Sequence, residues 1–574
     1  MAIKPFESRI QDLVYNVDVG IGLKLIKHGL YILGVLVIML LYTVTQFKGL
    51  KEAEAMDYAQ LGRNLMQTKS FITQCVRPAS MWYLIENTPQ HDPMIERHPD
   101  ILHPPVYPAL LAAGFRAVNY NFNADAASYL YPPEQWVVVP IGHLATLLTG
   151  LLVFLLGVRL FDRRIALISV SLFFLSNVVW ADAVSGLGVS VATLFTTLAF
   201  YFAILSGSSR KPDMPVTWAR RFIFCILSAL ACALAILTRY GTVVLVPAVL
   251  LYYVFSVPKR RFLWGMLFTL TVTLCVVPWL ARNYHVSGGL LGLAPYTALA
   301  DSSMFPGDLL ERTLAPTFKL GEIVGALKAK WMSGFANLYK NTLPTLGDGI
   351  LLGLFFATFF YRFVRNQVHL FRWCLLLALV LLLALAAFFG PATARLLHIL
   401  WPVVILYGTV FFFMLLDRLD FELRLVNMGV LIVFILLCAL PLIFSLLPPR
   451  VGIPYPPYFP PYINHICKLL LPTEMICSDM PWATAWYGRR NSLLLPANIN
   501  EFYEINDYTK RISGMYFTTI TRDKPYVSEL LTGSYKTWFP ILEGRIPADF
   551  PLTQGFPIGD MDQLFLTDRR RWEE

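Results

Sequence analysis

Charged residues are scarce in this sequence. Only 15% of its 574 residues are Asp, Glu, Lys or Arg, whereas 56% are hydrophobic. This composition excludes an ordinary water-soluble protein, which could not bury so much apolar surface. The eight cysteines show no CxxC or other metal-binding spacing, so the sequence gives no sign of a structural zinc site.

A cleavable signal peptide is also missing. About 28 mostly polar or mixed residues precede the first apolar run, and a signal sequence places its apolar region closer to the N-terminus. The first apolar run is therefore predicted to remain as a membrane span. No internal repeat is evident, which gives no support to an architecture built from repeated halves.

Long apolar runs recur between Gly29 and Leu447. A helix needs roughly 20 apolar residues to cross a bilayer, and this criterion predicts about eleven transmembrane helices in an all-α polytopic membrane protein. The predicted spans are 29–47, 136–158, 166–184, 187–205, 222–237, 240–257, 262–280, 346–361, 373–389, 396–416 and 428–447.

The net charge of +10 reports topology rather than nucleic-acid binding. The basic residues lie in short loops between alternate spans and not on one face of a domain. Such loops face the cytoplasm. The pattern therefore predicts a cytoplasmic N-terminus (1–28), a transmembrane domain (29–447), and two large extracytoplasmic loops, called here the first loop (48–135) and the second loop (281–345).

The composition changes after the last span. A Pro- and Tyr-rich stretch at 448–461 is typical of an extended linker. A small extracytoplasmic α/β domain is predicted at 462–574, called here the tail domain. Its predicted elements are a helix at 462–471, a strand at 475–477, a helix from Trp482 and a strand at 492–495. Cys467 and Cys477 lie close together in this domain, where a disulfide could form.

The first loop is too long for a simple connection and is predicted to be functional. Residues 53–66 have the spacing of an amphipathic helix, and a second helix is expected after Pro104 and Pro105. Both are predicted to lie in the membrane interface. The second loop is expected to close with another interfacial helix at 320–339.

Two acidic residues stand out in the first loop. Glu54 and Asp57 are three residues apart and share one face of the predicted helix. Such a pair could deprotonate an acceptor hydroxyl, bind a divalent cation, or be solvated without a function. Spacing alone leaves these alternatives open, and the metal requirement stays unknown.

The acidic helix and the segment 98–108 together resemble membrane glycosyltransferases of the GT-C class. The most similar groups are the protein O-mannosyltransferases and the lipid A aminoarabinose transferases. The resemblance covers most of 30–450 in layout, and the tail domain is similar to the tails of some bacterial members. Further segments that carry it are 160–164, 237–240, 278–283, 478–482 and 485–488.

This resemblance implies transfer of a sugar from a polyprenyl-phosphate carrier to a hydroxyl outside the cytoplasm. The family usually carries an Asp-Glu pair four residues before the position of Tyr58, where this chain has Glu54 and Ala55. Asp57 could take the role of the acid instead. His103 stands where the aminoarabinose transferases have a lysine that contacts the lipid phosphate.

The predicted site combines acids with cations, because a sugar leaves a phosphate readily when cations neutralise the developing charge. Each arginine could equally extend its charge to the membrane surface without binding substrate, and His398 has the same ambiguity. The predicted site residues are Glu54 and Asp57 as catalytic acids, His103, Arg63, Arg77, Arg239, Arg282 and Arg395 as ligands of the donor phosphate, and Tyr58, Tyr107 and His285 in the substrate pocket.

Two other functions compete with this interpretation. A transporter or lipid flippase would carry ionisable sites near the bilayer midplane. A polysaccharide polymerase or ligase would use a diphosphate-linked donor and would ordinarily lack the acidic helix. The sequence has no Asn-x-Ser/Thr sequon and no added lectin-like module, which favours a bacterial plasma membrane. The acceptor is left open between protein, lipid A and polysaccharide.

Overall fold

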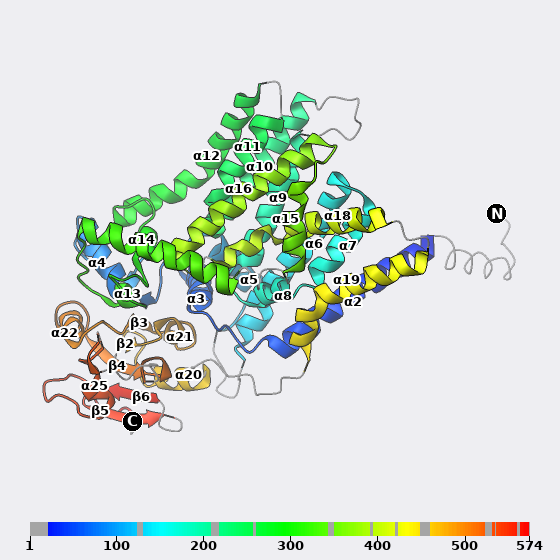
Figure 1. Ribbon diagram of the computed structural model, residues 1–574. Coiled ribbons are helices and arrows are strands. Elements are labelled where there is room, and N and C mark those ends of the chain that lie inside the picture. Colours follow the sequence, from blue (N-terminus) through cyan, green and yellow to red (C-terminus); the bar gives the residue numbers. More distant parts are fainter. Residues whose placement is uncertain are drawn as a thin grey trace, which may run out of the picture.

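The computed structural model describes residues 21–122, 130–207, 217–256, 260–342, 349–390, 394–419, 423–447, 460–522, 531–533, 535–558 and 563–572. Most of the predicted cytoplasmic segment 1–28 and all but the last two residues of the predicted linker 448–461 lie outside these ranges. Long helices form a bundle, and a mixed sheet lies at one end of it (Figure 1).

In their described residues, all eleven apolar segments predicted as spans are largely helical. Within the described ranges, eight helices are long and apolar enough to cross a membrane by length and composition. These eight are α2 (Ile21–Gln46), η2 (Glu134–Val138) with α6 (Val139–Leu160), α9 (Val189–Gly207), α10 (Trp218–Thr238), α12 (Arg261–Ser287), α16 (Asn366–Phe389), η8 (Arg395–Leu400) with α18 (Trp401–Leu419), and α19 (Arg424–Leu446).

The other three predicted spans differ from straight transmembrane helices. The segment 166–184 is the pair α7 (Arg163–Phe174) and α8 (Asn177–Val184), bent by 54°. Two further apolar helices are shorter: η3 (Tyr240–Val244) with α11 (Leu245–Ser256), and α15 (Ile350–Ala357) with η7 (Thr358–Phe360). The protein is therefore a polytopic helical membrane protein, with eight or nine spans by length and composition in the described chain.

The bend between α7 and α8 has a clear physical basis. A broken helix inside a bilayer must satisfy its freed backbone groups within the protein. The indole of Trp180 donates to the carbonyl of Phe174 at 2.7 Å, and Ser176 at the break accepts a hydrogen bond from Trp401 at 3.1 Å. These contacts let the chain turn at the break while it stays packed in the core.

Helix α2 lies beside α19 at one side of the bundle (Figure 1), where Gln46 donates to the carbonyl of Ser445. Leu25 and Leu30 on α2 are 67% and 63% exposed, and Phe444 on α19 is 66% exposed. Such a continuous apolar surface would be unfavourable in water. Lipid is therefore the medium that these two helices face.

Both large loops are folded. The helices predicted at 53–66, after Pro105 and at 320–339 are confirmed as α3, α5 and α14. The first loop contains α3 (Ala53–Thr68), α4 (Pro78–Asn87), η1 (Ile95–Arg97) and α5 (Val106–Val118). The second loop contains η4 (Ala294–Leu299), α13 (Leu309–Arg312), α14 (Leu320–Asn337) and η5 (Leu338–Thr342).

Helix α3 is enclosed more fully than its pattern predicts. Its polar residues Gln60, Arg63 and Asn64 are buried, although an amphipathic helix would expose them. Gly62 permits the close approach of α5, because a Cβ atom at this position would stand 2.7 Å from the Cβ of Leu111. The tail domain covers another side of α3, as described below.

The sheet has the strand order β1-β3-β2-β4-β6-β5. Strands β1 to β4 pair in parallel, and β6 pairs antiparallel with β4 and β5. The strands are β1 (Cys75–Val76), β2 (Met475–Ser478), β3 (Asn491–Leu494), β4 (Ile512–Phe517), β5 (Gln554–Ile558) and β6 (Gln563–Thr567). The accompanying helices are α20 (Pro460–Lys468), α21 (Pro481–Trp486), α22 (Ile499–Tyr508), α23 (Thr519–Arg522) and α25 (Phe539–Leu542).

The first strand of this sheet comes from the first loop. Cys75 pairs with Ser492 and Val76 with Leu493, so the tail domain is completed by a segment that precedes most of the membrane helices in sequence. The strands predicted at 475–477 and 492–495 are confirmed as β2 and β3. Cys467 and Cys477 are both buried free thiols.

Candidate active site

Helix α3 begins a few residues after α2 ends and carries both predicted acids. Glu52 precedes the helix with extended backbone angles, and Lys69 ends it in the left-handed conformation. This short connection fixes the first turn of α3 at the end of the helical bundle. Glu54 lies in that first turn, and Asp57 follows three residues later.

Glu54 forms an ion pair with the end of a transmembrane helix. Its Oε2 accepts from Arg239, which directly follows α10, at 3.0 Å, and its Oε1 accepts from the hydroxyl of Tyr58 at 3.2 Å. The Glu54 side chain is 29% exposed. Burial alone would raise the pKa of Glu54, but the charges of Arg239 and His103 lower it below its usual value. Glu54 is therefore an accessible carboxylate at neutral pH.

Asp57 has a different environment. It is 1% exposed, and its Oδ2 accepts from the guanidinium of Arg77 at 2.5 Å. Arg77 also donates to Glu311 of α13 at 3.0 Å. The three side chains form a network between α3, the start of α4 and the second loop, in which Asp57 and Arg77 are buried and Glu311 is partly exposed. Asp57 thus joins elements together, while Glu54 remains open to a substrate.

Aromatic rings and a histidine surround Tyr58. The ring of Tyr58 meets the rings of His103 and Tyr107 edge to face, with centroids 5.0 and 5.3 Å apart. Gly188, with a φ of +71°, lets the backbone pass close to Tyr107, where a Cβ atom would stand 2.8 Å from the ring. Glu54, Tyr58, His103 and Tyr107 therefore form one cluster.

Asp100 holds His103 in place. Its Oδ2 lies 2.9 Å from the Nδ1 of His103, and its Oδ1 accepts from the backbone amide of His103 at 2.8 Å. Burial alone would lower the pKa of His103, but the Asp100 carboxylate raises it above the usual value. A larger fraction of this imidazole is therefore charged at neutral pH than in a free histidine.

Two arginines from the helical bundle bring positive charge to this cluster. Arg239 donates to Glu54 and also to the carbonyl of Leu187 at 2.7 Å. Arg395, the first residue of η8, donates to Glu52 at 2.6 Å, and its side chain is 37% exposed. The first turn of α3 is thereby flanked by Arg239, Arg395 and His103.

Besides Asp57, four predicted site residues lie outside this cluster. Arg63 is 1% exposed and donates to the carbonyls of Ala485 and Trp486 in the tail domain. Arg77 is held in the Asp57 network. Arg282 donates to the carbonyls of Asp100 and Phe71, which ties α12 to the first loop. His285 is exposed near the end of α12, and none of the described contacts joins it to Glu54.

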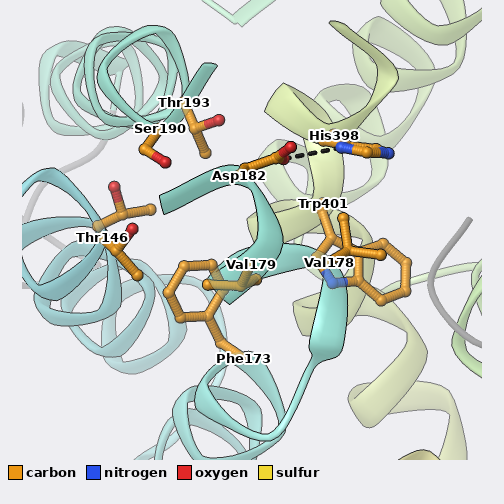
Figure 2. A pocket seen from close by; sticks show the side chains of 10 residues that line it. Thr146, Phe173, Val178, Val179, Asp182, Ser190, Thr193, His398 and Trp401 are labelled. Carbon is orange, nitrogen blue, oxygen red and sulfur yellow. Dashed lines mark hydrogen bonds and ion pairs between the residues drawn. The ribbon is translucent and has the colours of Figure 1, made fainter. Parts of the chain in front are cut away.

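The structure also pairs His398, whose role the sequence left open, with an acid that the sequence analysis did not single out. Asp182 at the end of α8 and His398 of η8 are 2.7 Å apart and border a small pocket in the bundle (Figure 2). Asp182 lies within an apolar run, and an acid in such a run is by default a functional candidate. An acidic residue inside the predicted span 166–184 could therefore have been recognised from the sequence.

No preformed metal cage is evident. Within the described ranges, His, Cys, Asp and Glu side chains form no group of three or more that could hold a metal ion. Glu54 and Asp57 are also drawn apart by ion pairs with different arginines. The two acids therefore do not converge on one cation position.

No family model matches this sequence, and neither does any curated protein. Its fold is nevertheless similar to those of solved membrane enzymes. ArnT from Cupriavidus metallidurans, bound to undecaprenyl phosphate, aligns with a TM-score of 0.55 and 11% identity over 94% of this chain and 98% of that chain. The Archaeoglobus fulgidus oligosaccharyltransferase in complex with Zn and sulfate gives 0.51 and 13%, over 88% and 70%. The predicted resemblance is therefore confirmed at the level of the fold, which this chain shares with an ArnT and with an oligosaccharyltransferase.

Proposed function

We propose that this protein is a glycosyltransferase that takes a sugar from a polyprenyl-phosphate donor. It transfers the sugar to a hydroxyl of a protein, lipid A or polysaccharide acceptor on the extracytoplasmic face of a bacterial plasma membrane. The observation that carries the proposal is the ion pair of Glu54 and Arg239 beside His103. It combines an accessible carboxylate with cations at the end of a membrane bundle, where a lipid-linked phosphate would meet both.

Arg239, Arg395 and His103 are the proposed ligands of the donor phosphate. Each already holds a carboxylate, namely Glu54, Glu52 and Asp100. A phosphate offers the same kind of charge-assisted acceptor to the guanidinium groups. Arg63, Arg77 and Arg282, which were predicted from the sequence for this role, are not assigned to the phosphate, because their contacts lead to the tail domain, to the Asp57 network and to the loop carbonyls of Asp100 and Phe71 rather than to Glu54.

Glu54 is the proposed general base. When the donor phosphate draws the guanidinium of Arg239 away, Oε2 of Glu54 is free to accept a proton from the acceptor hydroxyl. The acceptor oxygen then bonds to the anomeric carbon of the sugar. The bond from that carbon to the phosphate oxygen breaks, and its electron pair stays on the phosphate, which the three cations stabilise.

The competing functions lack comparable support. A transporter would need its principal ionisable site near the bilayer midplane, whereas this cluster lies in the first loop. A polymerase or ligase would use a diphosphate-linked donor. The ArnT structure that shares this fold contains undecaprenyl phosphate, a monophosphate carrier.

A transfer assay separates these alternatives. Purified protein in nanodiscs receives a radiolabelled sugar on polyprenyl monophosphate, and in a parallel reaction the same sugar on polyprenyl diphosphate. The proposal expects release of the lipid monophosphate and labelled acceptor only from the monophosphate donor. Transfer from the diphosphate donor alone would establish a polymerase or ligase, and movement of intact donor across the membrane without transfer would establish a flippase.

A further inference from the structure

Asp182 and His398 form a dyad that the proposed chemistry does not yet use. Nδ1 of His398 lies 2.7 Å from Oδ2 of Asp182, and the side chains are only 19% and 11% exposed. In Figure 2 the imidazole reaches Asp182 through this nitrogen, and the rest of the ring points away from the hydroxyl-lined side of the pocket. Nε2 is therefore the atom of this imidazole that can exchange a proton with a substrate.

The pocket beside the dyad carries several hydroxyl groups, although it lies among transmembrane helices and apolar side chains such as Phe173 and Val179 also line it. Thr146, Ser190 and Thr193 line it together with Asp182 (Figure 2). The hydroxyl of Ser190 is buried and makes no hydrogen bond to any residue in the described part of the chain. Such a hydroxyl is costly inside a bundle unless water satisfies it. The pocket therefore offers Asp182 a hydrated surround.

The dyad is adjacent to the proposed phosphate ligands. A 3-10 helix has three residues per turn, so Arg395 and His398 lie on the same face of η8. Asp182 is linked to Arg239 through one short loop: Ser185 donates to the carbonyl of Asp182, and Arg239 donates to that of Leu187. Besides His398, the charge of Asp182 acts on Arg239 and on Tyr42 of α2.

The proposed reaction leaves a task for such a group. Once Glu54 has taken the acceptor proton, the departing lipid phosphate becomes a monoester with a second negative charge. The second pKa of such a phosphate is about 6, so a proton delivered during bond cleavage makes it a better leaving group. Histidine is suited to this transfer near neutral pH, and an aspartate on Nδ1 fixes its orientation.

We propose that His398 is the general acid that protonates the leaving lipid phosphate and that Asp182 is its positioning residue. The proton moves from Nε2 of His398 to a phosphate oxygen as the bond between that phosphate and the anomeric carbon breaks. Glu54 then releases the acceptor proton to water, and His398 takes up a proton from water. The protons therefore balance over each turnover. This inference rests on the proposed glycosyl transfer.

The test compares His398→Gln and Asp182→Asn with the parent protein in the transfer assay between pH 6 and 9. The expected kcat of His398→Gln is about 100-fold lower with little change in donor KM, because one general acid typically contributes at least that factor. The fall in kcat that the parent shows at high pH, as its acid loses a proton, should disappear. Asp182→Asn should lower kcat less, because the ring remains but is poorly oriented.

A phosphorothioate donor distinguishes acid catalysis from a structural effect. Its leaving group is less basic and needs a proton less, so the deficit of His398→Gln should shrink with this donor. His465→Gln, at an exposed position on α20, is the matched control and should equal the parent.

A normal kcat, a change confined to donor KM, or an equal deficit with both donors overturns the assignment of His398. If His398→Gln does not fold, the pH profile of the parent is the test. A parental kcat that does not fall at high pH also overturns the assignment of His398. Failure of the parent to transfer from any polyprenyl monophosphate sugar would instead remove the proposed function.

Discussion

Glu54 and Asp57 illustrate how neighbouring acids on one helix acquire different roles. Helical spacing predicts that they share a face. In the structure, Arg239 reaches Glu54 from the helical bundle, whereas Arg77 of the first loop encloses Asp57. Sequence spacing could not separate the two acids, because both arginines are distant in sequence and their positions depend on the tertiary fold.

The first prediction separates these roles by mutation. Glu54→Gln should lower kcat about 100-fold to 10,000-fold, the usual contribution of a positioned base, and leave the thermal unfolding midpoint near that of the parent. Asp57→Asn should destabilise the protein by about 3–5 kcal/mol, the range for breaking one partner of a buried ion pair. Transfer assays and thermal unfolding in nanodiscs measure the two effects.

Glu86→Gln, at an exposed position on α4, is the control for both measurements. Glu52 is unsuitable because it pairs with Arg395. A stable Asp57→Asn protein with collapsed turnover, beside a fully active Glu54→Gln protein, would exchange the two assignments.

The second prediction concerns pH and His103. The pKa of His103 is raised in the fold by Asp100, so the imidazole is charged below that value and loses its charge as the pH rises through it. Donor KM should therefore increase from pH 6 to pH 9, because the neutral ring cannot form a charge-assisted contact with phosphate. The ion pair of Asp100 and His103 also stabilises the fold. Its contribution to the free energy of unfolding is complete below the pKa of an unfolded histidine, about 6.5, and is lost as the pH rises through the raised pKa of His103.

His103→Gln should show a higher KM at pH 6 and little further change with pH. A donor KM of the parent that stays constant over this range would exclude His103 as a phosphate ligand. The match of His103 to the lysine of related enzymes could be predicted from the sequence. The role of Asp100 as its partner required the structure, since three residues of loop can place two side chains in many ways.

At the scale of elements, the local pattern predicted most of what was found. Apolar runs indicated the helices, and short strand-like runs indicated β2 and β3. Strand β1 has only two residues, so no periodicity could reveal it. The burial of Arg63 was also not predictable, because two of its acceptors are backbone carbonyls of α21 that any residue could supply.

The third prediction concerns the junction between α21, η2 and the first loop. Glu134 is fully buried and accepts from Trp486 and Tyr487, each at 2.8 Å, and from the amide of Leu50 at 3.0 Å. Glu134→Ala would remove the carboxylate that these three buried donors share, and a lost buried hydrogen bond costs about 1–3 kcal/mol. The variant should unfold at a lower temperature and release the tail domain earlier in limited proteolysis.

Glu543→Ala changes an exposed glutamate of the tail domain and should behave as the parent does. If Glu134→Ala kept the parental melting temperature and cleavage pattern, the tail domain would be held by other contacts. Turnover of the variant should fall together with its stability, since α3 is packed against α21 through Arg63.

At the scale of the whole molecule, the arrangement of charges predicts an orientation. The basic residues between alternate spans indicate that the N-terminus is cytoplasmic and that the first loop, the second loop and the tail domain share the opposite side. The structure is consistent with one side for all three, because Arg77 meets Glu311 and β1 pairs with β3. The side itself is a matter for experiment.

The fourth prediction tests that side. A reporter that is active only in the cytoplasm, fused after Glu574, should be silent, and a periplasmic reporter at the same place should be active. The matching fusions at the N-terminus should give the opposite result. A cytoplasmic signal from the C-terminal fusion would place Glu54 on the cytoplasmic face and would contradict the predicted orientation.

The pairing of the first loop with the tail domain also sets the order of biosynthesis. Arg63 and its acceptor in Trp486 are 423 positions apart. At ribosomal rates of about 5–20 residues per second, roughly 20–85 s separate the synthesis of the two. During that interval helix α3 lacks the acceptors that its buried Arg63 uses in α21, and strand β1 lacks its partner β3. A nascent chain that stops before Trp486 would therefore have an incompletely folded first loop. A late stop codon should produce a protein that quality-control proteases cleave in the first loop as well as in the truncated tail domain.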